Sequence, residues 1–201
     1  MITVALTKGR LFKDFLKYMN ENDLNNYIRA LDGETRSLYT IVDNVKFIFA
    51  KGPDVPTYVE SGVADLGIVG SDIITEDAFN ILNVSQLPFG DCHFSVAALP
   101  DQEEFRVIAT KYTNIAHEYF KNKRQDVSLI HLNGSVELAP LLGLSDGIVD
   151  IVQTGGTLRD NGLVEHEKIM DIHARLIANK RTFYTKEDEI YDFIKEIGVI
   201  E

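Results

Sequence analysis

Cysteine is almost absent from this chain: Cys92 is the single cysteine among 201 residues. One thiol excludes an internal disulfide and a cysteine-rich zinc site, and it is typical of a protein from a reducing compartment. We interpret Cys92 as a small buried hydrophobe rather than a reactive thiol, because free cysteine is among the most buried residue types.

Long apolar segments are also lacking. No apolar run approaches the length of a transmembrane helix. The opening stretch "MITVALTKGR" holds too few apolar residues before its first charge to form the hydrophobic region of a signal peptide. These absences predict a cytoplasmic protein that does not contact a membrane.

Positive charge is in deficit, with 20 Lys and Arg against 31 Asp and Glu and a formal net charge of -11. This balance argues against general nucleic-acid binding, which needs a basic face. The protein can still bind a phosphorylated small molecule if local cations, backbone N–H groups or a metal offset the overall negative potential. The nucleoside-triphosphate P-loop, the GxGxxG dinucleotide loop and the HExxH zinc motif are all missing.

What the sequence does contain is an alternation of apolar runs and helix-like periodicity. Continuous apolar strands separated by helices predict mostly parallel α/β sheets with helices on both faces. The predicted strands include 2–6, 45–50, 65–70, 105–110, 127–132, 147–152 and a long one at 168–179, and the predicted helices include 9–20, 54–62, 114–123 and 186–199.

The alternation occurs as two series that separate near residues 88–93. We therefore expect two lobes, residues 1–91 plus 174–201 and residues 92–173. A cleft between two such lobes is the natural place for a ligand.

The stretch "GIVDIVQTGGTLRDNG" (147–162) contains the clearest candidate for a ligand-binding site. A buried strand runs into a glycine loop, and ligands of α/β sheets sit beyond the carboxyl ends of strands. Gly155 and Gly156 let the backbone approach an anion without a Cβ in the way. Thr154 and Thr157 add hydroxyl donors.

A helix predicted to start at Leu158 would offer N–H groups to the same anion. Asp150 cannot help to hold a phosphate, but its carboxylate can accept hydrogen bonds from the vicinal hydroxyls of a ribose. Phosphate plus ribose makes a phosphoribosyl site. The alternative is a plain turn in which Thr157 caps a helix.

At this point the sequence resembles the short form of the ATP phosphoribosyltransferase family. The main resemblance is "ELAPLLGLSDGIVDIVQTGGTLRDNGL" (137–163). Further matching motifs, in family order over nearly the whole chain, are "ALTKGRL" (5–11), "DVPTYVESGVADLGIVGSD" (54–72), "RVIATKY" (106–112) and "LNGSVELAP" (132–140). The chain stops at Glu201, without the regulatory extension of the long forms.

The resemblance implies a two-lobed fold like the type II periplasmic binding proteins. It implies that residues 1–91 plus 174–201 form the ATP side and that residues 92–173 carry the phosphoribosyl pyrophosphate loop. It implies transfer of phosphoribosyl from phosphoribosyl pyrophosphate to N1 of the ATP adenine, with Mg²⁺ carried by the substrates rather than by an assigned metal site. It also implies a homodimeric core and a separate regulatory subunit resembling histidyl-tRNA synthetase. A neutral ring nitrogen needs no base before it attacks, so the missing catalytic triad fits this chemistry.

Site residues follow from the matching motifs. Similarity to the family places Arg10 and Arg36 near the polyphosphates as catalytic cations. Lys8 and Gly9 belong to the same motif, and Lys51 stands where relatives often carry arginine. The other expected residues are Asp65, Gly67, Gly70 and Asp72 for ATP, Glu137 beside Asp150 for ribose hydroxyls or Mg²⁺, and Lys111 for phosphate.

Each of these residues also has a structural interpretation. The cations fit an ordinary surface, Glu137 fits the start of a helix, and the glycines fit turns. Two other functions stay open from the residues alone. One is a non-catalytic binding protein for a small anion. The other is a phosphoribosyltransferase for a free base, although such enzymes usually carry paired acids before the loop and this chain has Ile151 there.

Overall fold

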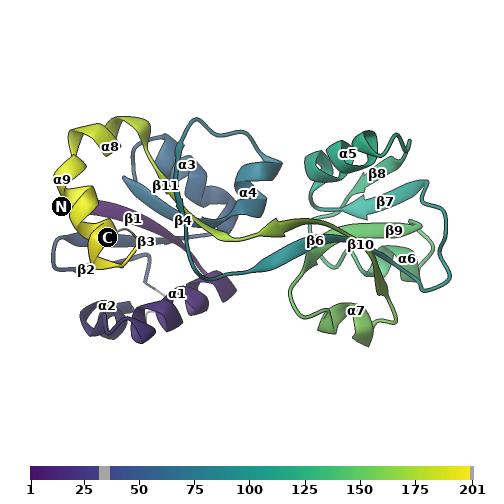
Figure 1. The fold of residues 1–201 in the computed structure, drawn as a ribbon, viewed down its shortest axis with the longest axis horizontal. Helices are drawn as coiled ribbons and strands as arrows, with labels where there is room; N and C mark the ends of the chain where they lie inside the picture. Colours follow the sequence, from purple (N-terminus) through teal and green to yellow (C-terminus); the bar gives the residue numbers. More distant parts are fainter. Residues whose placement is uncertain (32–36, 200–201) are drawn as a thin grey trace. The chain divides into compact units, whose positions relative to one another are not determined.

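The computed structural model describes residues 1–31 and 37–199. The chain divides into two compact units, Met1–Gly90 with His173–Glu201, and Asp91–Ile172. Each unit is built on one β-sheet (Figure 1).

The first unit contains a six-stranded sheet in the order β2-β3-β1-β4-β11-β5. Its centre, β3-β1-β4, is parallel. β2 pairs antiparallel with β3, β11 pairs antiparallel with β4, and β5 pairs antiparallel with β11. The strands are β1 (Ile2–Thr7), β2 (Tyr39–Val42), β3 (Val45–Ala50), β4 (Leu66–Gly70), β5 (Leu82–Gln86) and β11 (Ala174–Ala178).

Helices cover both faces of this sheet (Figure 1). Along β1, Val4 and Leu6 face the cluster that holds α1, α2 and α9, whereas Ala5 faces the cluster that holds α3 and α4. Burial on both faces explains why β1 reads as a continuous apolar run. The helices are α1 (Arg10–Glu21), α2 (Asn25–Leu31), the 3-10 turn η1 (Gly52–Asp54), α3 (Val55–Glu60), α4 (Ser71–Glu76), α8 (Lys180–Thr185) and α9 (Glu187–Glu196).

The second unit contains a five-stranded sheet in the order β10-β6-β9-β7-β8. Its centre, β9-β7-β8, is parallel; β6 pairs antiparallel with β9, and β10 pairs antiparallel with β6. The helix α5 (Thr113–Asn122) covers one face, and α6 (Leu138–Leu141) and α7 (Gly156–Asp160) cover the other (Figure 1). The strands are β6 (Cys92–Ala98), β7 (Val107–Thr110), β8 (Ser128–His131), β9 (Gly147–Val152) and β10 (Val164–Ile172).

The long strand predicted at 168–179 is two strands in two different sheets, so that prediction was wrong. β10 pairs with β6 in the second unit, and β11 pairs with β4 and β5 in the first. The break falls at His173, whose N–H donates to Ser71 Oγ at 3.1 Å and whose carbonyl accepts from the Ser71 N–H at 2.9 Å. An apolar run shows that a segment is buried, but it carries no signal for a change of sheet.

Candidate active site

The carboxyl ends of three parallel strands meet at one edge of the second sheet. β9 and β8 both run parallel to β7, so the segments after Thr110, His131 and Val152 lie at the same edge. In α/β sheets this edge is where ligands bind. It is also where the chain carries Lys111, the 132–137 loop and the 153–155 loop.

Asp150 lies on β9 and projects from the face of the sheet that α6 and α7 cover. Its register partner across β6 is Ser95, and its neighbours Ile148 and Val152 pack into the same cluster as those helices. Burial raises the pKa of Asp150 to about 6, and the charge of Glu137 adds to the rise. The Ile151 N–H and the Lys111 ammonium oppose that rise in pKa. Glu137 and Lys111 are therefore both close enough to influence the Asp150 carboxyl.

The glycine loop differs in one detail from the sequence prediction. The helix begins at Gly156 rather than at Leu158, because Gly155 takes the left-handed conformation (φ 67°) and turns the chain there. The Thr154 hydroxyl accepts the Gly156 N–H at 3.4 Å. The Leu158 side chain is buried in the core, so it anchors the loop and only its backbone can face a ligand.

The helix that follows the loop is five residues long. Its macrodipole is correspondingly small. The helix can contribute to anion binding because the first N–H groups of any helix lack an intrahelical acceptor. These backbone donors, the Thr154 and Thr157 hydroxyls and the nearby Asp150 carboxylate give the edge both anion-binding and hydroxyl-binding groups.

The first unit has a similar edge, formed by the ends of β1, β3 and β4. A Cβ placed on Gly52, just after β3, would stand 3.2 Å from Thr7 Oγ1 at the end of β1 and 3.0 Å from Ile73 Cδ1 just after β4. The three strand ends are thus packed together.

Most of the cations and polar residues expected on the ATP side lie at this edge. Gly9 has a φ of 100° and immediately precedes α1, which Arg10 begins. The Lys8 ammonium donates to the Ser37 carbonyl at 3.3 Å and lies 5.9 Å from the centre of the Phe49 ring. Lys51, Gly70 and Asp72 follow or end the neighbouring strands, and Arg36 lies outside the described residues.

Asp65 and Gly67 do not lie at the carboxyl end of a strand. Asp65 precedes β4 and is 3% exposed, and its carboxylate accepts from the Lys186 ammonium at 2.9 and 3.0 Å and from the Thr3 N–H at 2.8 Å. A Cβ on Gly67 would stand 2.8 Å from a Val59 methyl, so this glycine lets α3 pack on β4. Both residues have structural partners at the other end of the strand.

We expect Asp65→Ala to destabilise the first unit by about 3 kcal/mol, because it leaves the Lys186 ammonium and the Thr3 N–H without their acceptor. Urea unfolding measures this loss. The Michaelis constant for ATP should stay unchanged in the folded fraction. Glu21→Ala, which removes an exposed ion pair with Lys17, is the matched control and should cost less than about 0.5 kcal/mol. A stable Asp65→Ala protein with a raised Michaelis constant for ATP would restore Asp65 to the substrate site.

One group of polar residues next to the loop was not predicted from the sequence. Ser95 and His93 on β6 hydrogen-bond Glu165 on β10, and Arg159 lies against Gly155. The side chains of β6 and β10 come together through the pairing of these two strands. Ser95 and His93 are 70 and 72 positions away from Glu165 in the sequence. Local motifs contain no signal for such a pairing.

Within residues 1–31 and 37–199, no group of three or more His, Cys, Asp or Glu side chains is placed to hold a metal ion. Among the same residues, no helix is long and apolar enough to cross a membrane. Cys92 is buried in the core of the second unit, as predicted.

Comparisons with known proteins agree with the resemblance seen in the sequence. The HisG family model, described as ATP phosphoribosyltransferase, matches residues 51–198. An ATP phosphoribosyltransferase of Staphylococcus carnosus (strain TM300) is 51% identical over 200 residues, covering 99% of this chain and 98% of the relative. One of Staphylococcus aureus (strain MRSA252) is 49% identical over 199 residues, with coverage of 99% and 98%.

Two solved structures are similar to this chain over nearly its whole length. The ATP phosphoribosyl transferase (HisG:HisZ) complex from Thermotoga maritima matches with a TM-score of 0.81 and 30% identity, over 98% of this chain and 96% of that one. The alkanesulfonate-binding protein SsuA from Xanthomonas axonopodis pv. citri, bound to MOPS, matches with a TM-score of 0.59 and 12% identity, over 98% and 71%. The second likeness concerns the fold alone and confirms the predicted type II binding-protein architecture.

The family model and the full-length relatives favour the transferase over an anion-binding protein or a transferase for a free base. The chain belongs to the ATP phosphoribosyltransferase family, which transfers phosphoribosyl from phosphoribosyl pyrophosphate to N1 of ATP in the first step of histidine biosynthesis.

Proposed function

We propose that the second unit binds phosphoribosyl pyrophosphate at the strand edge built from β7, β8 and β9. The backbone and hydroxyls of residues 154–158 hold the 5′-phosphate, and Asp150 accepts hydrogen bonds from the ribose 2′- and 3′-hydroxyls. Glu137 assists Asp150. The observation that carries this proposal is the half-buried Asp150 carboxylate, placed two residues before the strand end that leads into the loop.

The residues present suit a reaction that depends on positioning. Adenine N1 is neutral and attacks C1′ with its own lone pair, while the electron pair of the C1′–O bond leaves with pyrophosphate. Positive charge develops on the ribose in between. The chain has to hold the ribose and both phosphate groups still and supply fixed charges, which is how positioning and electrostatic stabilisation lower a barrier.

The first unit supplies the ATP side in this proposal. Lys8, Gly9 and Arg10 follow β1, and Lys51 follows β3, so their charges and N–H groups gather at one edge. Gly70 and Asp72 at the end of β4 complete it. Arg10 and Arg36 remain the proposed catalytic cations, since a planar guanidinium matches phosphate oxygens. We leave Asp65 and Gly67 out, because their partners are structural.

Magnesium fits this site as a companion of the substrate. Mg²⁺ is usually held by one or two carboxylates together with substrate phosphates, not by an all-protein cage. Glu137 and Asp150 are electrostatically coupled carboxylates at the proposed ribose site, and they are the residues that would hold it. When bound, the ion supplies charge that stabilises the departing pyrophosphate.

We also propose a partner subunit. The Thermotoga maritima structure is a HisG:HisZ complex, and the matched chain of that complex covers 98% of this protein. We infer that this chain assembles with a regulatory subunit of the same kind, resembling histidyl-tRNA synthetase, around a homodimeric core in the cytoplasm. Nucleic acid and membrane have no part in the proposal.

An assay of the purified chain with ATP, phosphoribosyl pyrophosphate and Mg²⁺ tests this function. We expect formation of phosphoribosyl-ATP and pyrophosphate, with transfer of isotope from both substrates into one product. We expect histidine to inhibit only after the partner subunit is added. Absence of the adduct under all conditions would overturn the proposed reaction, and strong inhibition of the isolated chain by histidine would overturn the role of the partner.

A further inference from the structure

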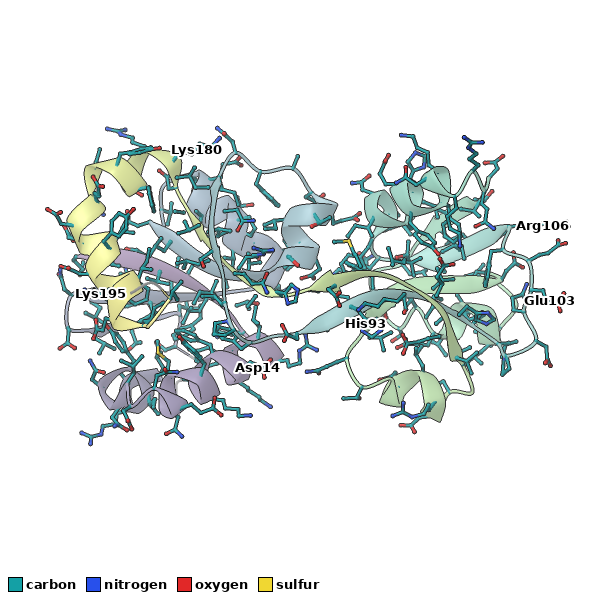
Figure 2. The ribbon with its side chains drawn as sticks, viewed as in Figure 1. Asp14, His93, Glu103, Arg106, Lys180 and Lys195 are labelled. Atoms are coloured by element: carbon teal, nitrogen blue, oxygen red, sulfur yellow. The ribbon has the colours of Figure 1, made fainter. Side chains whose placement is uncertain are left out.

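The Glu165 carboxylate, which lies outside the glycine loop, is held in place by two residues of a neighbouring strand. The Ser95 hydroxyl donates to Glu165 Oε2 at 2.7 Å, and His93 Nε2 lies 2.7 Å from the same oxygen. Ser95 is fully buried, and Figure 2 shows His93 near the start of β6. Glu165 comes from β10, so the contacts join the side chains of adjacent strands.

This group lies on the same face of the sheet as the proposed ribose site. Ser95 is the register partner of Asp150, and His93 is that of Val152 at the end of β9. Paired residues of antiparallel strands project from the same face, with Cβ atoms about 5 Å apart. Glu165 is thus attached to the strand that borders Asp150 and the start of the loop.

The other end of the Glu165 carboxylate faces the loop itself. A Cβ on Gly155 would stand 3.6 Å from Glu165 Oε1 and 2.9 Å from Arg159 Nη1. The carboxylate and the guanidinium therefore both lie against the left-handed glycine. Hydrogen bonding from Ser95 and His93 and the charges of His93 and Arg159 lower the pKa of Glu165, so it is an anion at neutral pH.

We propose that Glu165 is a positioning residue for the phosphate loop: fixed by Ser95 and His93, its carboxylate orients the Arg159 guanidinium against Gly155 and so sets the loop in its anion-binding conformation. The proposal deepens the proposed function and rests on it, because it takes residues 154–158 as the phosphate site.

The alternative is that these contacts only hold the sheet together. β6 and β10 already pair along Cys92–Ala98 and Val164–Ile172 through their backbones. The Glu165 side chain is 37% exposed, and exposed ion pairs add little to stability. A purely structural role would therefore leave the Michaelis constants unaffected.

The test uses Glu165→Gln in the full chain. The amide keeps the shape of the side chain and loses its charge. We expect the Michaelis constant for phosphoribosyl pyrophosphate to rise about tenfold, the loss typical of one hydrogen bond to a charged group, while that for ATP stays within about twofold. Glu167→Gln is the matched control: it lies on the same strand and pairs with Lys123 instead. It should leave both constants unchanged.

A double-mutant cycle tests the route through Arg159. If Glu165 acts by orienting that guanidinium, Arg159→Gln raises the same Michaelis constant, and adding Glu165→Gln to it causes no further loss. Additive losses would overturn the proposal. So would an unchanged Michaelis constant in Glu165→Gln, or an equal change in Glu167→Gln.

Ser95→Ala is the alternative test if Glu165→Gln fails to fold. It removes the hydrogen bond from the Ser95 hydroxyl and leaves the Glu165 carboxylate in place. It should raise the Michaelis constant for phosphoribosyl pyrophosphate by about threefold to tenfold, and no change would contradict the proposal. Failure of the phosphate site itself is distinguishable, because Gly156→Val would then also leave that Michaelis constant unchanged.

Discussion

Asp150→Asn is expected to lower kcat/KM for phosphoribosyl pyrophosphate by about 100-fold while making the protein more stable. The amide loses the charge that accepts two ribose hydroxyls, which costs about 3 kcal/mol of binding for two charge-assisted hydrogen bonds. Steady-state kinetics with phosphoribosyl pyrophosphate varied at saturating ATP measures the first effect. Asp160→Asn, an exposed carboxylate on the adjacent α7, is the control and should change neither quantity.

The gain in stability follows from the raised pKa of Asp150, about 6 against an ordinary 3.8. Between these two values the folded protein binds more protons than the unfolded chain, so its stability falls as pH rises. Above pH 6 the full cost of the buried charge is present, and the amide removes it. We expect the free energy of unfolding to rise by about 1–2 kcal/mol at pH 7.5. The gain should shrink toward pH 4.

The same pKa predicts the acid side of the pH–rate profile. The carboxylate accepts ribose hydroxyls only when it is ionised, so kcat/KM should fall as pH drops through about 6. Phosphate groups of the substrate titrate in the same range. The informative quantity is therefore the ratio of wild type to Asp150→Asn, which should decline below pH 6. A constant ratio, or unaltered kinetics in the variant, would refute the ribose role.

Gly156→Val is expected to remove nearly all activity without disturbing the fold. A Cβ at this position would meet only Thr154 Oγ1, at an ordinary 3.6 Å. The added side chain therefore fits the protein and occupies space that the phosphate needs. Displacing a substrate by about 1 Å costs on the order of 100-fold in rate, so kcat/KM should fall at least that far. Gly156→Ala should show a smaller loss.

Gly155→Ala is the informative comparison for that experiment. Gly155 has φ 67°, where a side chain costs about 1–2 kcal/mol, and its Cβ would stand 2.9 Å from Arg159 Nη1. This variant should lose both activity and thermal stability, whereas Gly156→Val should lose activity alone. Full activity in Gly156→Val would rule out close approach of an anion at that position.

Much of the fold could be predicted because buried strands are contiguous apolar runs. The strands predicted at 45–50 and 147–152 have the predicted bounds, and α5 begins one residue before its predicted start at 114. The prediction failed at 168–179, where one apolar run serves two sheets. The expected lobe boundary, between residues 173 and 174, lies within this run, but the run itself shows no break that would divide it into two strands.

In the candidate site, features formed by residues close in sequence could be predicted, and features formed by contacts between distant residues could not. Asp150 and the 154–158 loop could be predicted because only three residues separate them in the sequence. The structural partner of Asp65, Lys186, lies 121 residues away and cannot be seen in the local motif. Glu165 was missed for the same physical reason, since its contacts depend on how β6 and β10 pair.

The first sheet is completed by a strand that follows the whole of the second unit in the sequence. β11 lies between β4 and β5, so β5 has no neighbouring strand until residues 174–178 arrive. The second unit, Asp91–Ile172, is continuous in sequence and needs neither end of the chain. On the ribosome it can therefore fold first, while the amino-terminal strands wait for the carboxyl-terminal segment. Such long-range closure is slow, and a truncation at the carboxyl end would leave apolar strand edges open to aggregation.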